Sequence, residues 1–200
     1  MAKDFLTAVQ DRRSYYSIGK EATVPDGRIR EIIEHAVKHT PSPFNSQSAR
    51  VVLLLGGEHD KLWDIVKETL RKTVPPERFA ATEKKIDSSC RSGYATVLFF
   101  EDQAVVRGLQ EKFPLYADSF PLWSLQSSGM HQFVVWTALE AEGFGASLQH
   151  YNPLIDAAVK QQWSLPDEWQ LLAQMPFGKP LAPPGSKEFE PLADRIRVFG

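Results

Sequence analysis

The sequence HTPSPFNSQSAR, residues His39 to Arg50, lies between a helical pattern and an apolar strand pattern. Pro41 and Pro43 stiffen this loop, because each proline ring fixes its own backbone and keeps the preceding residue out of the helical region. Asn45 and Gln47 are two positions apart, so in an extended segment their amides face the same side and could bind the edge of a heterocycle. The alternative is a connector whose polar side chains cap a helix and bond to their own backbone.

The elements on either side of this loop have clear patterns. Apolar residues recur at helical spacing from Asp26 to His39. Val51 to Leu55 is a continuous apolar run closed by two glycines, which is typical of a strand covered on both faces. We therefore expect a central strand directly after the loop, and a second buried strand from Tyr94 to Phe100.

The rest of the chain divides into further helices, late strands and an extended tail. Helices are predicted over residues 4–11, 59–73, 76–89, 102–112, 117–142 and 154–163, and strands over 168–175 and 194–199, with a turn at 176–180. The helix at 117–142 is expected to be a buried spine, because Met130, Phe133 and Val134 are too apolar for a surface. Strands that are separated by helices early and crowded late indicate an α+β fold with a sheet of about five strands, in one domain of residues 1–200.

The composition of the 200 residues narrows the kind of function. Hydrophobic residues make up 42% and charged residues 24%, which allows a sizeable core. The net charge is -2, without a run of five basic residues, so neither nucleic acid nor a membrane is an expected partner. A single cysteine, Cys90, and a polar start favour a cytoplasmic location, and no apolar run is long enough to span a membrane. These features favour small-molecule chemistry.

Two clusters of side chains are candidates for ligand binding. Arg12, Arg13 and Ser14 follow a short helix and could hold a phosphate through forked hydrogen bonds. Arginines at a helix C-terminus also serve to complement the helix dipole, and this alternative stays open. His35 and His39 have the i, i+4 spacing of metal ligands, but the residues between them lack the glutamate of a zinc protease motif, so we predict no metal site.

Common catalytic motifs do not occur in this sequence. It contains no Gly-x-Ser-x-Gly elbow, no phosphate-binding Gly-x4-Gly-Lys loop and no Cys-x2-Cys pair. The stretch from Gly143 to Leu148 lacks the third glycine of a dinucleotide fingerprint and leads from helix to strand, the reverse of the Rossmann order. A bound cofactor could carry the reaction instead. A flavin matches the available groups: cations for a phosphate, amides for a pyrimidine edge and aromatics for a flat ring.

Four short motifs are distributed along nearly the whole chain: RRS at 12–14, TPSPFNSQ at 40–47, GFGA at 143–146 and FGKP at 177–180. They occur in the order of the FMN-dependent nitroreductase family, which this chain resembles. The segments LQHYNP at 148–153 and FFED at 99–102 further resemble a small-subunit branch found in bacteria and fungi. The resemblance implies a nitroreductase-like fold and a homodimer with FMN at the subunit interface. It also implies that each sheet is completed by the partner's C-terminal strand and that NAD(P)H is the electron donor.

The same resemblance implies roles for individual residues. The set that would bind the cofactor consists of Arg12, Arg13 and Ser14 at the phosphate and ribityl chain, Ser42, Asn45 and Gln47 reaching the flavin from the neighbouring subunit, Gln149 and His150 at the ring, and Lys187 at the phosphate. Tyr16 is added to this set as a departure, because many members carry Lys or Arg there, near the flavin pyrimidine. A cation at that place favours the anionic reduced flavin, so the tyrosine leaves the redox potential and the ease of nitro reduction open.

Three aromatic residues just before the long apolar helix are candidates for the acceptor site. Tyr116, Phe120 and Trp123 either form a lid over the flavin or pack as a satellite core. The favoured function is hydride transfer from NAD(P)H through FMN to nitroaromatic, quinone or similar small-molecule acceptors by a ping-pong mechanism. The alternative is a flavin-binding redox sensor or regulatory protein with little turnover.

Overall fold

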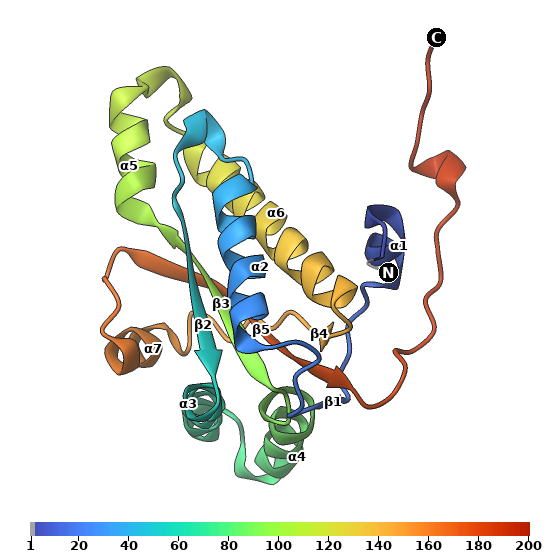
Figure 1. Cartoon of the computed structure of the whole chain (residues 1–200). Coiled ribbons are helices and arrows are strands. Elements are labelled where there is room, and N and C mark those ends of the chain that lie inside the picture. Colours follow the sequence, from blue (N-terminus) through green and yellow to red (C-terminus); the bar gives the residue numbers. More distant parts are fainter. Residues whose placement is uncertain (1–2) are drawn as a thin grey trace.

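The computed structural model describes residues 3–200 (Figure 1). Its helices and strands, in chain order, are α1 (Phe5–Asp11), β1 (Ile18–Gly19), α2 (Asp26–His39), β2 (Ala49–Leu55), α3 (Gly57–Thr73), α4 (Pro76–Ile86), β3 (Ala95–Asp102), α5 (Gln103–Lys112), α6 (Phe120–Ala141), β4 (Gly145–Ala146), α7 (Asp156–Trp163) and β5 (Trp169–Pro180). The predicted helices are confirmed to within three residues at each end. No helix in this part of the chain is long and apolar enough to cross a membrane.

The sheet has five strands, in the order β1, β5, β3, β2, with β4 paired to β5. All of these strand pairs are antiparallel, and a parallel bridge joins Ser14 to Ala146. The predicted α+β fold with a mainly antiparallel sheet of about five strands is therefore confirmed. The central position belongs to β3, which pairs with β2 along one edge and with β5 along the other.

The core lies on both faces of this sheet, because successive side chains of β3 point to opposite sides. Val97 and Phe99 pack with residues of α2 and α6. Leu98 and Phe100 pack with residues of α3, α4 and α7. Figure 1 shows the two helical layers, with α2 and α6 on one side of the strands and α3 and α4 below them. Full burial of a side chain of this size stabilises the fold by about 1.5–3 kcal/mol.

The strand after the loop is an edge strand, which corrects the expectation that it is central. Within residues 3–200, β2 pairs only with β3, and Val51, Val52 and Leu53 are only partly buried. The continuous apolar run at residues 51–55 predicted a strand covered on both faces, and residues of β2 do pack with both core clusters. For β2 it gave no information about the neighbouring strand, because apolar side chains point away from the sheet edge where that neighbour would bind.

One prediction about the last part of the chain is wrong, and another stays a prediction. The turn expected at 176–180 is the end of β5, where Phe177 pairs with Ala146 and Lys179 with Gly19. Gly178 permits this crowding, since a Cβ there would lie 2.2 Å from the carbonyl oxygen of Gly19. The predicted strand at 194–199 is not paired within the described chain. Because a strand needs a partner that accepts its hydrogen bonds, and this one was expected to pair with another subunit, it stays a prediction.

Helix α6 is buried along only one side, which corrects the expectation of a buried spine. Val135 and Leu139 belong to the core between α6 and the sheet. Met130, Phe133 and Val134 are 36–41% exposed. Apolar residues on a helix favour a covered face, but the helix alone does not say whether the same chain covers it.

Candidate functional site

The first group of predicted site residues lies where α1 ends. The helix ends at Asp11, and the next residue, Arg12, has an extended backbone. The Arg12 guanidinium lies over the ring of Trp136 on α6, 4.4 Å from its centroid. Its Nε is buried and has no hydrogen-bond partner among residues 3–200, and burial together with the neighbouring Arg13 lowers the pKa of Arg12. A buried donor on a cation is costly when it is unpaired, so this nitrogen is suited to an anionic ligand.

A hollow of about 870 Å³ beside α1 brings Arg13 and Lys187 together. Arg13 donates a hydrogen bond of 2.8 Å to a backbone carbonyl of the tail, which fixes the tail near the helix. Asp11 and Glu140 also line the hollow, and Lys3 lies 3.0 Å and 2.7 Å from their carboxylate oxygens. Three cations against two carboxylates leave the hollow with a net positive charge.

The chain after the two arginines runs beside β4. Ser14 forms a parallel bridge with Ala146, and the Tyr15 N–H donates to the Ala146 carbonyl at 2.9 Å. A Cβ on Gly145 would lie 2.8 Å from the side chain of Tyr15, so this close approach requires glycine. The RRS and GFGA motifs, which are far apart in the sequence, are thus adjacent in the fold. Tyr16 is exposed.

Gln149 and His150 lie a short distance along the chain from β4. The backbone N–H of Gln149 donates to the Gln174 carbonyl at 2.7 Å, and the Gln174 N–H returns a bond of 2.9 Å. The Gln149 amide donates to the Ser147 hydroxyl at 3.0 Å, while His150 is exposed. Gln149 follows Ala146 by three residues, so it lies within about 11 Å of the residue that pairs with Ser14.

The second group lies in the loop between α2 and β2. The Ser42 hydroxyl accepts a hydrogen bond of 2.9 Å from the Gln47 N–H, and its carbonyl accepts one of 3.0 Å from the Asn45 N–H. Phe44, Asn45 and Gln47 have φ angles of 53°, 52° and 51°. The expectation of an extended loop is therefore wrong. The bonds to Ser42 are those of the connector alternative, but three non-glycine residues in the left-handed region are typical of a functional segment rather than of a simple connector.

The predicted aromatic residues gather around Phe44, which sequence reasoning did not select as a site residue. The ring centroids of Tyr116 and Phe120 lie 6.0 Å and 5.5 Å from that of Phe44. Phe120 is 1% exposed and forms the base of the cluster, as in the satellite-core alternative. Trp123 and Phe44 line a shallow hollow of about 330 Å³ together with Ser42. Phe44 could have been selected from the sequence, because it lies in the loop that was already a candidate for ligand binding.

The two groups contact α6 at different levels, and one chain does not bring them together. The loop contacts the helix at Ser127, whose hydroxyl donates to the Pro41 carbonyl at 2.9 Å. Arg12 contacts it at Trp136. The helix rises by about 14 Å between these positions, and Figure 1 shows the loop and α1 beside opposite ends of α6.

The remaining candidate residues show no sign of a metal site or of a reactive thiol. Within residues 3–200, no group of three or more His, Cys, Asp or Glu side chains is placed to hold a metal ion. The rings of His35 and His39 lie 4.4 Å apart on α2. Cys90 is buried, and burial raises the pKa of its thiol to about 12, so the reactive thiolate is disfavoured.

Comparison with known proteins assigns the chain to a family. The model of the Nitroreductase family matches residues 9–179. The nitroreductase FRM2 of Saccharomyces cerevisiae is 35% identical over 191 residues, which cover 93% of each chain. The structure of the nitroreductase CinD from Lactococcus lactis in complex with chloramphenicol is 44% identical, with a TM-score of 0.90, over 98% of this chain and 100% of that one. The chain therefore belongs to the nitroreductase family, and its class of activity is that of an oxidoreductase.

Two further structures extend this likeness. CinD in complex with 4-nitrophenol is 45% identical, with a TM-score of 0.89, over 98% of this chain and all of that one. A more distant structure, from Desulfovibrio desulfuricans, is in complex with FMN. It is 21% identical with a TM-score of 0.71, covers 100% of this chain and 99% of its own, and shows a shared fold.

Proposed function

We propose that residues 1–200 form a single FMN-binding unit that acts as an NAD(P)H-dependent oxidoreductase of the nitroreductase type. The observation that carries this proposal is the cationic hollow beside α1. Arg13 and Lys187 line the hollow, and the adjacent residue Arg12 has a buried donor without a partner among the described residues. These groups fit a phosphate, because guanidinium groups bind phosphate oxygens through forked, charge-assisted hydrogen bonds.

The residues beside the hollow have defined tasks in this proposal. Arg12, Arg13 and Lys187 hold the FMN phosphate, and Ser14, next to Ala146, contacts the ribityl chain. Gln149 and His150 would lie at the ring, where a backbone N–H could donate to the flavin. Tyr16 supplies a hydrogen bond near the pyrimidine. Bound FMN supplies the redox chemistry, which is the transfer of a hydride from NAD(P)H to a nitroaromatic, quinone or similar acceptor in alternating half-reactions.

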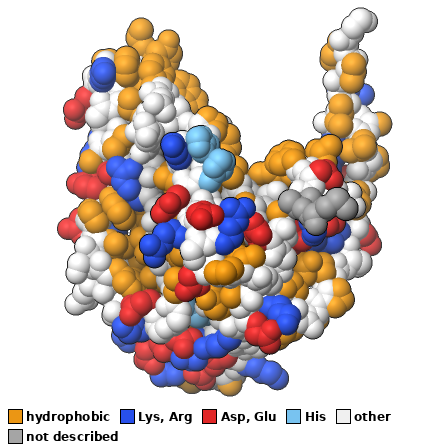
Figure 2. All heavy atoms as spheres, viewed as in Figure 1, with side chains coloured by type: hydrophobic (Ala, Val, Ile, Leu, Met, Phe, Trp, Pro, Cys, Tyr) orange, Lys and Arg blue, Asp and Glu red, His pale blue; other side chains and the backbone are white. Residues whose placement is uncertain are grey.

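A homodimer brings the second group of residues to this flavin. The apolar side chains exposed on α6 include Leu122, Leu125, Met130 and Phe133, and Figure 2 shows hydrophobic side chains on both sides of the hollow between the body and the C-terminal arm. A surface of this kind is suited to a second copy of the chain. Ser42, Asn45 and Gln47 of that copy then approach the flavin, and its tail residues 194–199 add a strand to the free edge of β2.

The acceptor is expected to bind beside the aromatic cluster. Trp123 and Phe44 border the shallow hollow next to Ser42, so an aromatic acceptor placed over the flavin would contact them. The relative CinD has been solved with 4-nitrophenol, which supports nitroaromatic compounds as the acceptor class. The buried single cysteine is compatible with a cytoplasmic location.

The test is spectroscopic. The purified protein should be yellow, should contain about one FMN per chain, and should lose its flavin absorbance anaerobically with NADPH or NADH. A quinone or 4-nitrobenzoate should then restore the absorbance. The control is the Arg12→Ala variant, which should be nearly colourless after gel filtration. Yellow protein that neither nicotinamide bleaches would support the sensor alternative, and parent protein that retains no flavin would overturn the proposal.

A further inference from the structure

Helix α6 has an unusual polar stripe on its buried side. The four polar residues nearest the loop, all less than 5% exposed, are Ser124, Ser127, Ser128 and His131. The exposed residues of the same helix include Leu122, Leu125 and Met130. Polar groups toward the interior and apolar groups toward solvent are the reverse of an ordinary surface helix. A buried hydroxyl without a hydrogen bond is costly. The hydrogen-bond partners of these residues therefore show which segments the stripe binds.

The loop between α2 and β2 is attached to this stripe at its first end by Ser127. The Ser127 hydroxyl donates a hydrogen bond of 2.9 Å to the carbonyl of Pro41. His131 supports it from the next turn of the helix, because its Nδ1 lies 2.9 Å from the Ser127 carbonyl and must donate to that acceptor. The beginning of the loop is therefore fixed to α6.

The other end of the loop is attached through a buried carboxyl group on β3. Glu101 is 0% exposed, and its Oε2 accepts hydrogen bonds from the Ser48 hydroxyl at 2.6 Å and from the Ser124 hydroxyl at 2.7 Å. One oxygen thus links the last loop residue to α6. The other oxygen, Oε1, is buried and has no hydrogen-bond partner among the described residues.

The loop between these two attachments holds an unfavourable backbone. Phe44, Asn45 and Gln47 all have positive φ angles near 52°, a conformation that side chains with a Cβ rarely adopt. Two hydrogen bonds to Ser42 inside the loop support it. Such conformations persist only where the surroundings fix them. Here the two attachments to α6 act together with the ring contacts of Phe44 and with Arg50, whose guanidinium donates to the Gln47 carbonyl at 2.8 Å.

We propose that Ser127 and Glu101 are positioning residues that fix both ends of the loop to α6, and so hold Asn45 and Gln47 in the backbone conformation in which they approach the flavin. This inference rests on the proposed function for the identity of the ligand. Neither residue touches the flavin; each acts through the backbone of the loop. Three residues of the polar stripe, Ser124, Ser127 and His131, are then explained as the support of a cofactor-binding loop, while Ser128 accepts a hydrogen bond from Gln132 of the same helix.

The experiment compares three variants of the attachments with one matched control. Ser127→Ala removes the first attachment and Glu101→Leu the second. Glu101→Gln retains an oxygen that both serine hydroxyls can use. The control is Thr96→Val, because Thr96 is also fully buried on β3 and its hydroxyl makes two hydrogen bonds away from the loop. It accepts one from Trp63 Nε1 and donates one to His59 Nδ1, since His59 Nε2 donates to the Arg91 carbonyl.

Two measurements are made on each full-length variant. The first is the FMN dissociation constant by fluorescence titration, and the second is the rate of amide hydrogen exchange in the peptide that covers residues 42–48 without FMN. Ser127→Ala and Glu101→Leu should each raise the dissociation constant about two- to tenfold, as expected for one or two lost hydrogen bonds, and should speed exchange in the loop. Glu101→Gln should return both quantities to near the parent values.

The outcomes separate this inference from the proposed function. The inference is supported if the two attachment variants exchange faster in the loop and bind FMN less tightly, while Thr96→Val lowers the melting temperature and leaves both loop measurements unchanged. It is overturned if Thr96→Val weakens FMN binding as much as the attachment variants do, since the effect would then be general destabilisation. Unchanged loop exchange in Ser127→Ala and Glu101→Leu would also overturn it, whether or not FMN binds. A parent chain that binds no FMN would instead overturn the proposed function.

Discussion

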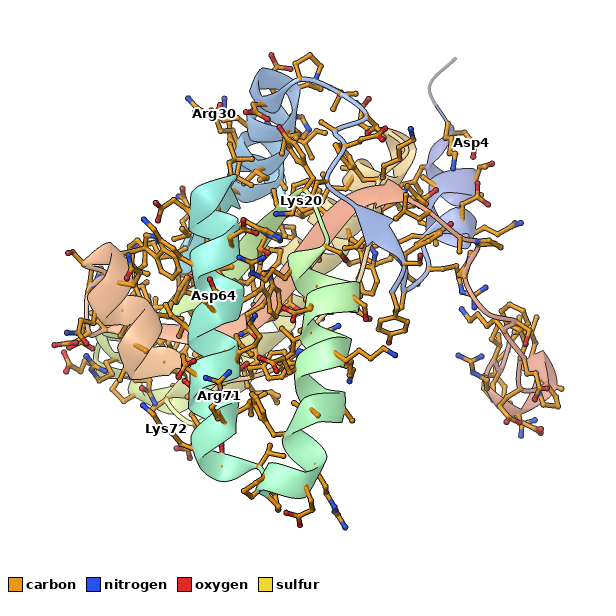
Figure 3. The ribbon with its side chains drawn as sticks, turned by 90° about the horizontal axis from the view of Figure 1, so that it is seen from below. Asp4, Lys20, Arg30, Asp64, Arg71 and Lys72 are labelled. Atoms are coloured by element: carbon orange, nitrogen blue, oxygen red, sulfur yellow. The ribbon has the colours of Figure 1, made fainter. Side chains whose placement is uncertain are left out.

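The helices on the two faces of the sheet have opposite kinds of surface. On the side of α3 and α4 the charges are paired, for example Lys67 with Asp87 at 2.9 Å and Arg91 with Asp64 at 3.1 Å, and Figure 3 shows this side with Asp64 labelled on α3. On the side of α1 and α6 large apolar side chains are exposed: Phe5, Leu6, Leu122, Leu125, Met130 and Phe133. The first side has the charged surface of a protein face that is exposed to water. The second needs a cover, and the proposed cofactor site lies at that unfinished side.

The strongest test of this difference is removal of the tail. Deleting residues 193–200 should abolish dimerisation and FMN binding together, because the proposed exchanged strand lies in this segment and the flavin needs residues of both subunits. Size-exclusion chromatography with detection at the flavin absorbance band measures both properties at once. A circular dichroism spectrum with parent helix content would show that the truncated chain still folds. A truncated protein that remains a yellow dimer would contradict the exchanged strand.

The next largest effect is expected at the aromatic cluster. Phe120→Ala should lower the free energy of unfolding by about 3–5 kcal/mol and visibly lower the melting temperature, because Phe120 is fully buried. Trp123 lies at the shallow hollow, so Trp123→Ala should change the KM values and the ranking of acceptors with a smaller loss of stability. The two variants thus separate core from acceptor site. Trp123→Ala with the parent ranking of acceptors would assign this tryptophan to the satellite core as well.

The phosphate assignment predicts a smaller change, in affinity rather than in stability. Arg12→Ala or Lys187→Ala should each raise the FMN dissociation constant about ten- to hundredfold, because each removes a charge-assisted contact to phosphate. Fluorescence titration measures this directly. Lys72→Ala, on α3 at the other side of the sheet (Figure 3), is the matched control for the loss of one positive charge. Equal weakening in the control would show that only the net charge matters.

The buried carboxyl group of Glu101 should make the stability of the protein depend on pH. Burial raises the pKa of Glu101 above its ordinary value of 4.5, with the Ser48 and Ser124 hydroxyls opposing the shift. The stability that comes from its protonated form is therefore complete below pH 4.5 and is lost as the pH rises through the raised pKa. Glu101→Gln keeps a neutral side chain, so its melting temperature relative to the parent should increase from pH 4 to pH 8. A constant difference between the two proteins would contradict a raised pKa of Glu101.

The smallest effect is expected on the charged side. Arg71 pairs with Glu68 at 2.6 Å and with Glu83 at 3.1 Å, and all three side chains are well exposed. Arg71→Ala should change the free energy of unfolding by less than about 1 kcal/mol, because exposed ion pairs are screened by water and salt. It should also leave FMN binding and the dimer unchanged. Urea denaturation would check the first point, and a larger loss would mean that this surface contributes more than its exposure suggests.

The sequence predicted where helices and strands lie along the chain more reliably than which strands pair with one another. The helix at 26–39 has the predicted bounds, because helical spacing of apolar residues depends only on local geometry. The position of β2 at the sheet edge was missed, since apolar side chains point above and below a sheet and carry no information about lateral pairing. Glu101 was noted only as part of a family-like segment. A carboxyl group directly after the apolar run of a buried strand was the signal that could have identified it.

What the sequence by itself determined was the family, the α+β class and the residue types suited to a phosphate and a flat ring, because these depend on motif order and composition. Only the tertiary structure decided where those residues lie. It placed Arg13 and Lys187 at one hollow, left Arg12 Nε without a partner among the described residues, and put the loop at a different level of α6. It also showed that apolar residues of α6 expected to be buried are exposed. Burial depends on what packs against a helix, which the sequence of the helix alone does not specify.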